Sequence, residues 1–263
     1  MDYDDAYANA AHIEGAETYP GRWLTASREW AAQQASLGLR REALPYGPSE
    51  RHRFDLFLPR GSPEGLVVFV HGGFWLKFDR TYWFHLSRGA IERGWAVAIP
   101  SYDLCPAIRI SGITRQIVAA ITAAASLVKG HIALTGHSAG GHLVSRMLEP
   151  GLLAADVATR LRHVLPISPL SDLRPLMHTK MNAALKIDAR EAMEESPLFM
   201  QSRLDIPTTV WVGAEERPAF LDQARWLSSA WSVAQVIAPC RHHFDVIEPL
   251  CDAQSAMVST LLE

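Results

Sequence analysis

The chain has 263 residues and a formal net charge of −3 at pH 7, and 48% of its residues are hydrophobic. Its Lys and Arg residues do not gather into a patch, so the sequence indicates neither nucleic acid nor an anionic membrane as a partner. A chain of this length can bury a large core, and we expect one domain over residues 1–263 that acts on a small molecule.

The first residues argue against export. They read MDYDDA and are acidic, whereas a signal peptide begins with basic residues and continues into an apolar run. The most apolar helical stretch, residues 117–128, is too short to span a bilayer. Three cysteines without a CxxC pair are typical of a reducing compartment. We therefore expect a soluble, cytoplasmic protein, and a homodimer is compatible with the composition.

Apolar runs rich in β-branched residues alternate with amphipathic stretches, which is typical of a mostly parallel central sheet flanked by helices. The expected strands cover residues 53–58, 66–70, 95–100, 131–136, 162–168, 208–213 and 233–239. The expected helices cover residues 82–93, 114–128, 142–148, 218–229 and 245–262. Two stretches look irregular, residues 3–48 and residues 170–200, and the second lies where a small helical cap would be inserted.

Two glycines directly follow the expected strand 66–70, in the sequence HGGFW of residues 71–75. Glycine lets a backbone approach a ligand closely, so the amides of Gly72 and Gly73 could point at one developing oxyanion. The alternative is a tight turn with no chemical role.

A G-x-S-x-G pentapeptide occupies residues 136–140, between an expected strand and an expected helix. Strand, sharp turn and helix together form the context of a nucleophile elbow, in which a strained backbone exposes the serine. We therefore take Ser138 as the candidate nucleophile and the Ala139 amide as a third oxyanion donor.

A serine nucleophile needs a base and a third group that orients the base. In the order that accompanies such an elbow, the acid and then the histidine follow in the loops after later strands. The loop after strand 208–213 offers Glu215 and Glu216, and we favour Glu216 because it directly precedes the next helix. The loop after the last strand offers His242 and His243, and we favour His243 because the apolar Phe244 would anchor it.

The sequence gives little indication of a metal or cofactor. It has no HExxH motif and no glycine-rich phosphate loop, and the adjacent histidines 242 and 243 project in different directions. We expect neither a metal nor a cofactor.

These motifs resemble the α/β-hydrolase superfamily and, within it, the kynurenine formamidase (arylformamidase) group, which is related to the hormone-sensitive-lipase-like esterases. The matching segments are residues 46–48, 55–59, 71–75, 102–106, 136–143, 171–176, 196–198 and 243–245, which span nearly the whole chain. The resemblance implies a cofactor-free serine hydrolase that cleaves an aryl formamide or a small aryl ester. Two positions depart from the group, which usually has Asp where this chain has Glu216 and commonly has Tyr where it has Phe74.

The triad does not determine whether the substrate is an amide or an ester, so the pocket must. Phe74, Trp75 and Tyr102, with Tyr82 and Trp83 as further candidates, indicate a planar apolar substrate, or else these aromatics belong to the core. A general short-chain carboxylesterase or thioesterase is the alternative within the same chemistry. A small-molecule-binding protein without activity is the alternative from another class, because a fold alone does not establish catalysis.

Overall fold

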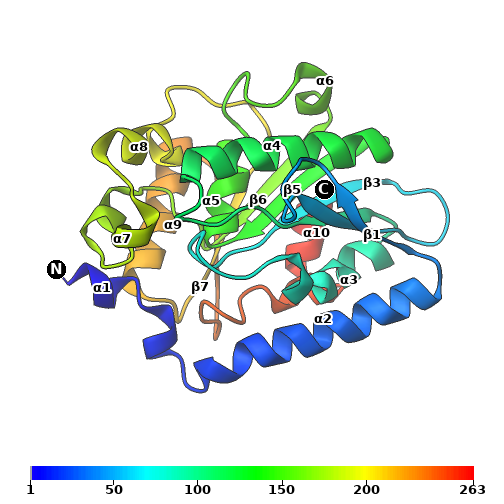
Figure 1. The fold of residues 1–263 in the computed structure, drawn as a ribbon, viewed down its shortest axis with the longest axis horizontal. Coiled ribbons are helices and arrows are strands. Elements are labelled where there is room, and N and C mark those ends of the chain that lie inside the picture. The colour runs from blue at the N-terminus through cyan, green and yellow to red at the C-terminus, as the bar shows by residue number, and fades with distance from the viewer. Residues whose placement is uncertain (1) are drawn as a thin grey trace.

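The structure is a computed structural model that describes residues 2–263. Within these residues, eight strands form one sheet in the order β1-β2-β4-β3-β5-β6-β7-β8 (Figure 1). β2 pairs antiparallel with β1 and β4, and the remaining neighbours are parallel. The strands are β1 (Arg40–Pro45), β2 (Arg53–Phe57), β3 (Gly65–Val70), β4 (Ala96–Pro100), β5 (His131–His137), β6 (Leu161–Ile167), β7 (Thr209–Gly213) and β8 (Ala234–Ala238).

Helices cover both faces of this sheet (Figure 1). One hydrophobic cluster joins the sheet to α4 (Ile110–Leu127), α5 (Ala139–Arg146) and α9 (Pro218–Trp231). A second cluster joins the opposite face to α2 (Tyr19–Ser36), α3 (Arg88–Glu92) and α10 (Ala256–Leu262). The central strands β3 and β5 are apolar and almost wholly buried because both faces are covered, as parallel strands require.

All seven expected strands are confirmed, as is the mostly parallel sheet flanked by helices. The expected helices of residues 114–128, 142–148 and 218–229 correspond to α4, α5 and α9. The other two are shorter than expected. Residues 82–93 contain two 3₁₀ turns and α3, and residues 245–262 contain a 3₁₀ turn and α10, because Pro249 and the turn before Ser255 interrupt the longer helix.

The expectation of an irregular stretch over residues 3–48 was wrong. The 18-residue helix α2 carries Pro20 in its first turn and buries Trp23, Trp30 and Ala31, which recur at helical spacing on one face. Strand β1 follows it at the edge of the sheet. Its half-exposed sequence RREALP does not alternate between polar and apolar residues, so periodicity could not reveal it.

The expected cap of residues 170–200 is helical and irregular. It contains 3₁₀ turns at Arg174–His178 and Pro197–Phe199, and the short helices α7 (Asn182–Leu185) and α8 (Ala189–Glu194). The N-terminal helix α1 (Tyr3–Ala6) lies against this segment (Figure 1), since Tyr3 stacks on His178 with ring centroids 5.4 Å apart. A 3₁₀ turn at Asn9–His12 follows α1. The backbone amide of Lys180 donates to the Asp4 carboxylate at 2.6 Å, so the chain's first turn is tied to the cap.

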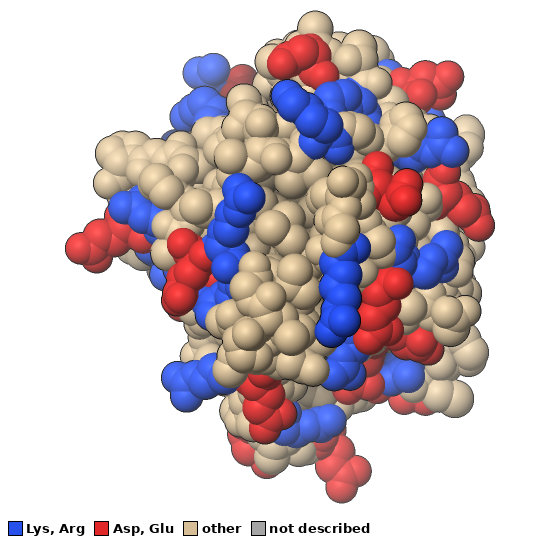
Figure 2. Space-filling view, turned by 90° about the vertical axis from the view of Figure 1, so that its right-hand side faces the viewer, with Lys and Arg blue, Asp and Glu red and all other residues tan. Residues whose placement is uncertain are grey.

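Helix α4 begins four residues earlier than expected and reaches 18 residues, a length and composition that could cross a membrane. Half of it is buried within the protein, and a core helix passes the same test. Basic and acidic side chains are interspersed on the face seen in Figure 2, without a large area of one sign.

Candidate active site

Ser138 lies in the turn between β5 and α5. Its φ of 58° and ψ of −115° are a strained conformation for a residue with a side chain. The turn is held by the Ser138 amide, which donates to the Ile167 carbonyl at 2.8 Å. A side chain at Gly140 would overlap the Val70 carbonyl, so the elbow can pass under β3 only with glycine at this position. The serine is thereby held against the carboxyl edge of the sheet.

The loop after β3 passes close to this serine. A Cβ atom added to Gly72 would lie 3.1 Å from the Cβ atom of Ser138 and 2.7 Å from the His137 carbonyl oxygen. Gly73, at φ 107°, continues the loop in a conformation that side chains disfavour. Among residues 2–263, the amides of Gly72, Gly73 and Ala139 have no hydrogen-bond acceptor. An N–H at the first position of a helix has no partner within that helix, so the Ala139 amide is free by geometry.

Glu216 and His243 form a buried pair. Glu216 Oε2 lies 2.6 Å from His243 Nδ1, and the two side chains are 0% and 4% exposed. The other carboxylate oxygen accepts the Gly213 amide at 2.9 Å and the Ser168 hydroxyl. Because the carboxylate accepts from several donors, its orientation toward the imidazole is fixed.

The alternatives that the sequence left open lie elsewhere. Glu215, which precedes Glu216 in the chain, is exposed to solvent. The Nε2 atom of His242 lies 3.0 Å from the Tyr19 hydroxyl, and its Nδ1 atom lies 3.2 Å from an Asp245 carboxylate oxygen. The structure therefore brings Glu216, rather than Glu215, to His243, and it gives His242 a different set of partners.

Two further histidines, His137 and His71, lie beside the turn that carries Ser138. His137 lies beside His243 with ring centroids 4.6 Å apart, and burial, assisted by His243, holds the pKa of His137 well below its usual value. Burial also lowers the pKa of His71 to about 4. His71 stacks on Tyr102 at 4.3 Å and contacts the Gly72 carbonyl through Nδ1 at 2.8 Å. Both imidazoles are neutral at pH 7 and pack against the loop.

Ser138 and His243 face one cavity of about 470 Å³, and Gly72, Gly73 and His137 line it with them. Its other walls are mainly aromatic and apolar, which suits a planar apolar ligand. They are formed by Tyr7, Ala8, Asn9, Ala10, Ala11, Trp23, Phe74, Leu76, Lys77, Phe78, Trp83, Met181 and Phe244.

Three of the aromatics proposed for the pocket, Trp75, Tyr82 and Tyr102, do not line the cavity. The Tyr82 ring packs edge-on against Phe78, with centroids 5.0 Å apart. Phe74 and Trp83 line the cavity, but Trp75 and Tyr102 are completely buried and do not. The Trp75 ring packs edge-on against His142, and the Tyr102 hydroxyl donates to the His71 carbonyl at 2.8 Å. Phe74 and Trp75 both have a positive φ, 53° and 57°; Phe74 lines the cavity, whereas Trp75 packs in the hydrophobic core. Trp75 and Tyr102 support the glycine loop from behind.

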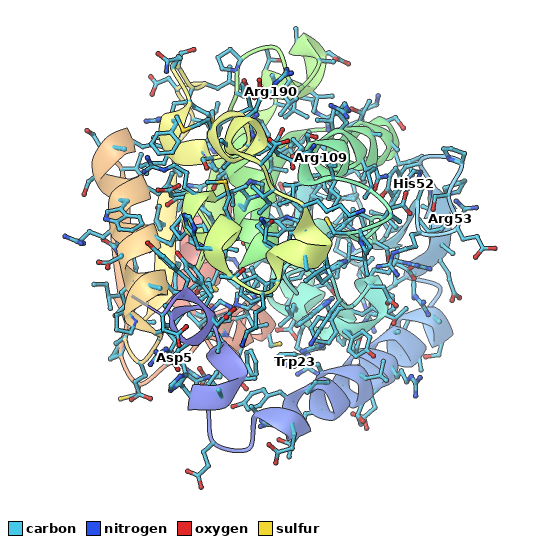
Figure 3. The ribbon with its side chains drawn as sticks, turned by 60° about the vertical axis from the view of Figure 1, so that its left-hand side comes forward. Asp5, Trp23, His52, Arg53, Arg109 and Arg190 are labelled. Carbon is cyan, nitrogen blue, oxygen red and sulfur yellow. The ribbon has the colours of Figure 1, made fainter. Side chains whose placement is uncertain are left out.

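Residues 7–11 of the N-terminal segment line the cavity, a role that the sequence did not predict. Arg217 at the start of α9 reaches the Asp5 carboxylate at 2.6 Å, and His12 reaches the same carboxylate at 2.7 Å. The hydrogen bond from His12 is the main cause that lowers the pKa of Asp5. Figure 3 shows Asp5 close to α9 and Trp23 on the side of α2 that faces the rest of the protein. No motif in residues 7–11 indicated this role.

The described residues, 2–263, contain no group of three or more His, Cys, Asp or Glu side chains arranged to hold a metal ion. Cys105 is buried, and burial raises the pKa of its thiol to about 11, so it is a poor nucleophile at neutral pH. Ser138 and His243 line the cavity, and Glu216 reaches it only through its contact with His243 at 2.6 Å.

A family model described as alpha/beta hydrolase fold matches residues 67–243. A kynurenine formamidase from Danio rerio is 28% identical over 236 residues, which are 84% of this chain and 80% of that protein. A crystal structure from Silicibacter sp. tm1040, provisionally assigned as a thioesterase, is 56% identical, covers 100% of both chains and has a TM-score of 0.98. Esterase B from Lactobacillus rhamnosis, 18% identical over 94% of this chain and 92% of its own, shares the fold with a TM-score of 0.67.

Proposed function

Because the chain belongs to the α/β-hydrolase family, we propose that it is a serine hydrolase that cleaves a small aryl formamide or carboxylic ester through an acyl-enzyme. The observation that carries the proposal is the 2.6 Å contact between buried Glu216 and His243, because His243 lines the same cavity as Ser138. A buried carboxylate that holds an imidazole beside a strained serine supports general-base activation of that serine.

Each residue then has a role. His243 takes the proton of the Ser138 hydroxyl while the serine oxygen attacks the substrate carbonyl, and Glu216 stabilises the imidazolium that forms. The amides of Gly72, Gly73 and Ala139 stabilise the oxyanion of the tetrahedral intermediate. As the intermediate collapses, His243 protonates the leaving amine or alcohol. Water then attacks the acyl-enzyme with His243 again as base, which releases the acid and restores Ser138.

The proposed substrate class follows from the cavity and from the relatives. The largely aromatic wall supports an aryl leaving group, and about 470 Å³ suits a small molecule. The similarity to kynurenine formamidase supports N-formylkynurenine or a close analogue as the amide to test first. We place the enzyme in the cytoplasm as a monomer or homodimer.

A thioesterase is the second candidate, and the 56% identical structure with a provisional thioesterase assignment is the observation that favours it. The same serine chemistry would cleave a thioester, with a thiol in place of the amine as leaving group. The triad would therefore serve either activity, and the wall of the cavity would decide which substrate binds.

A substrate panel separates these candidates. The purified protein would be assayed on N-formylkynurenine, p-nitrophenyl acetate and acetyl-coenzyme A, with covalent labelling by a serine-directed organophosphate. We expect labelling at Ser138 and the highest kcat/KM on the aryl formamide or the aryl ester. A preference for the thioester would assign the second candidate. Absence of turnover and of labelling would support a binding protein without activity.

A further inference from the structure

Asn9 is a buried amide without a partner. The residue is 5% exposed, and neither its side-chain oxygen nor its side-chain nitrogen has a hydrogen-bond partner among residues 2–263. It lines the same cavity as Ser138 and His243. An unpaired buried polar atom costs about 1–3 kcal/mol, so an amide with both ends unpaired is a substantial loss of stability that calls for an explanation.

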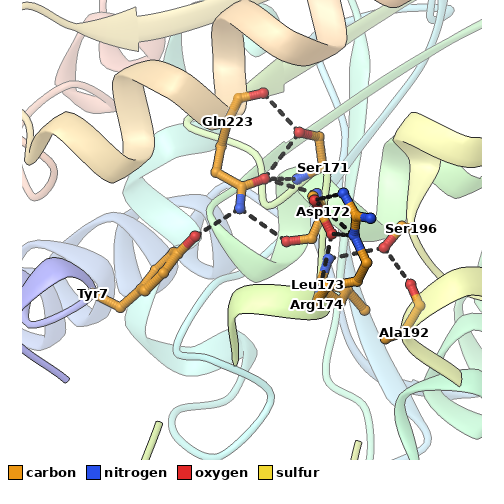
Figure 4. Close-up of polar contacts among 8 residues, drawn as sticks. All are labelled: Tyr7, Ser171, Asp172, Leu173, Arg174, Ala192, Ser196 and Gln223. Atoms are coloured by element: carbon orange, nitrogen blue, oxygen red, sulfur yellow. Dashed lines mark hydrogen bonds and ion pairs between the residues drawn. The ribbon is translucent and has the colours of Figure 1, made fainter. Parts of the chain in front are cut away.

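The nearby amide Gln223 shows how this fold satisfies such a group (Figure 4). Its oxygen accepts the backbone amides of Ser171 and Asp172, each at 2.7 Å. Its nitrogen donates to the Asp172 carbonyl and to the Tyr7 hydroxyl, each at 2.8 Å. Because the two accepted amides fix the oxygen end, the nitrogen end must face Tyr7. A structural amide in this region is thus fully paired, and Asn9, two residues after Tyr7, is not.

The segment that carries Asn9 is firmly held, so the lack of partners does not come from a loose end. Tyr7 is bound to Gln223, and its ring packs against Phe220 with centroids 5.7 Å apart. Asp5, on the other side, is bound to Arg217 at 2.6 Å. These contacts fix residues 5–12 over the cavity and keep Asn9 in its wall.

We propose that Asn9 is a specificity-determining residue whose carboxamide binds an uncharged carbonyl or amide group on the substrate, away from the bond that is cleaved. This inference rests on the proposed hydrolase function. A carboxamide offers a donor and an acceptor together, which matches a group that presents both. A site built to hydrogen-bond such a group disfavours an analogue that lacks it, because the protein's polar atoms are then left unpaired.

The charges around the cavity explain why this group is uncharged. Apart from the histidines, Lys77 is the one ionisable basic or acidic residue among the lining residues, and it is exposed. His137 is neutral because burial lowers its pKa. Exposed Lys77 is screened by water, so a buried ion beside Asn9 would lose its hydration without a buried counter-charge. A neutral amide would gain hydrogen bonds at little cost.

The test compares phenyl acetate with 3-carbamoylphenyl acetate and 4-carbamoylphenyl acetate in three proteins, namely the wild type, Asn9→Leu and Gln34→Leu. Gln34 is a matched control, since it is 4% exposed, its side-chain oxygen is also unpaired, and it does not line the cavity. The three esters differ in intrinsic reactivity, but this difference cancels in the ratio of kcat/KM between a variant and the wild type for the same ester. We expect Asn9→Leu to lower kcat/KM for at least one carbamoyl ester about tenfold more than for phenyl acetate, mainly through KM. Gln34→Leu should leave this ratio at the wild-type value.

Stability provides the readout that separates binding from a structural role. Asn9→Leu removes two unpaired polar atoms, so its Tm should equal or exceed that of the wild type. The nearly isosteric Asn9→Asp, which loses the N–H donors, should lose the same preference. Wild-type turnover of phenyl acetate, combined with equal effects of Asn9→Leu on all three esters, would overturn the role of Asn9. Absence of wild-type turnover on every ester, without labelling of Ser138, would instead overturn the proposed function.

Discussion

The floor and the roof of the cavity are built in different ways. The floor is the carboxyl edge of the sheet, where Ser138, Glu216 and His243 follow β5, β7 and β8 and are fixed by backbone strain and buried hydrogen bonds. The roof is the N-terminal segment, held by side-chain contacts such as that of Asp5 with Arg217. The residues proposed to react therefore follow strands of the sheet, whereas much of the cavity wall comes from distant parts of the chain, such as residues 7–11 and Trp23.

The strongest test of the floor is Ser138→Ala. If the serine is the nucleophile, kcat should fall by about 10⁴–10⁶ because losing a triad member removes most of the catalysis. The variant should keep the far-ultraviolet circular dichroism spectrum and the Tm of the wild type. Retention of more than a tenth of wild-type turnover on every substrate of the panel would remove the serine from the mechanism.

The next test distinguishes the two neighbouring acids. Glu216→Gln keeps the size of the side chain but removes the charge that supports His243, and kcat should fall by about 10⁴. Glu215→Gln is the matched control, since Glu215 is exposed and should change kcat little. Steady-state kinetics of both variants on one aryl ester decides the matter. The reverse ranking would move the acid to Glu215.

A smaller effect is expected where the roof meets the cap. Gln223→Leu leaves the amides of Ser171 and Asp172 unpaired in a buried site, so the free energy of unfolding should fall by about 2–4 kcal/mol. Urea denaturation measures this loss. Asn9→Leu provides the contrast. Removal of the paired amide of Gln223 should lower the stability, whereas removal of the unpaired amide of Asn9 should not. Equal losses in the two variants would make both amides structural.

The last prediction concerns pH. Burial lowers the pKa of His71 to about 4 and that of His142 to about 3, against about 6.5 for an unfolded histidine. The unfolded chain therefore binds more protons than the folded one below pH 6.5, and the free energy of unfolding should fall as the pH decreases toward 4. Urea denaturation at pH 7.5, 6 and 5 measures the slope.

Two variants test whether a buried histidine causes this pH dependence of the free energy of unfolding. His142→Gln should flatten it, because the residue that resists protonation in the folded state is removed. His131→Gln, at an exposed position, should leave the slope as it is. A stability that stays constant between pH 7.5 and 5 would show that the buried histidines do not control it.

Most of the floor could be predicted because its residues sit beside strong local signals. Glycines mark the close approach of backbones at Gly72 and Gly140, and buried strands are recognisable from their apolar runs. The sequence also narrowed the acid to Glu216 or Glu215 because strand order fixes the loop that carries it. In an irregular loop, the sequence does not indicate which side chains face the cavity and which face the core. Trp75 and Tyr102 were therefore assigned to the cavity, although both are buried in the core.

The roof could not be predicted for a related reason. The contact between Asp5 and Arg217 joins residues 212 positions apart, and no local pattern encodes such a pair. Residues 7–11 are mainly small, so their sequence shows neither periodicity nor a motif. α2 was also overlooked, because its polar face is broad and its apolar face consists largely of widely spaced tryptophans.

The indole rings of Trp23 and Trp83, whose centroids are 4.7 Å apart in the cavity wall, provide a built-in optical sensor. An aryl ligand that stacks on this pair changes the polarity around both rings and can quench their emission. Intrinsic fluorescence of the Ser138→Ala variant would then report ligand occupancy directly. Affinities could be ranked for compounds that are never turned over, which frees the search for the natural substrate from any assumption about the bond that is cleaved.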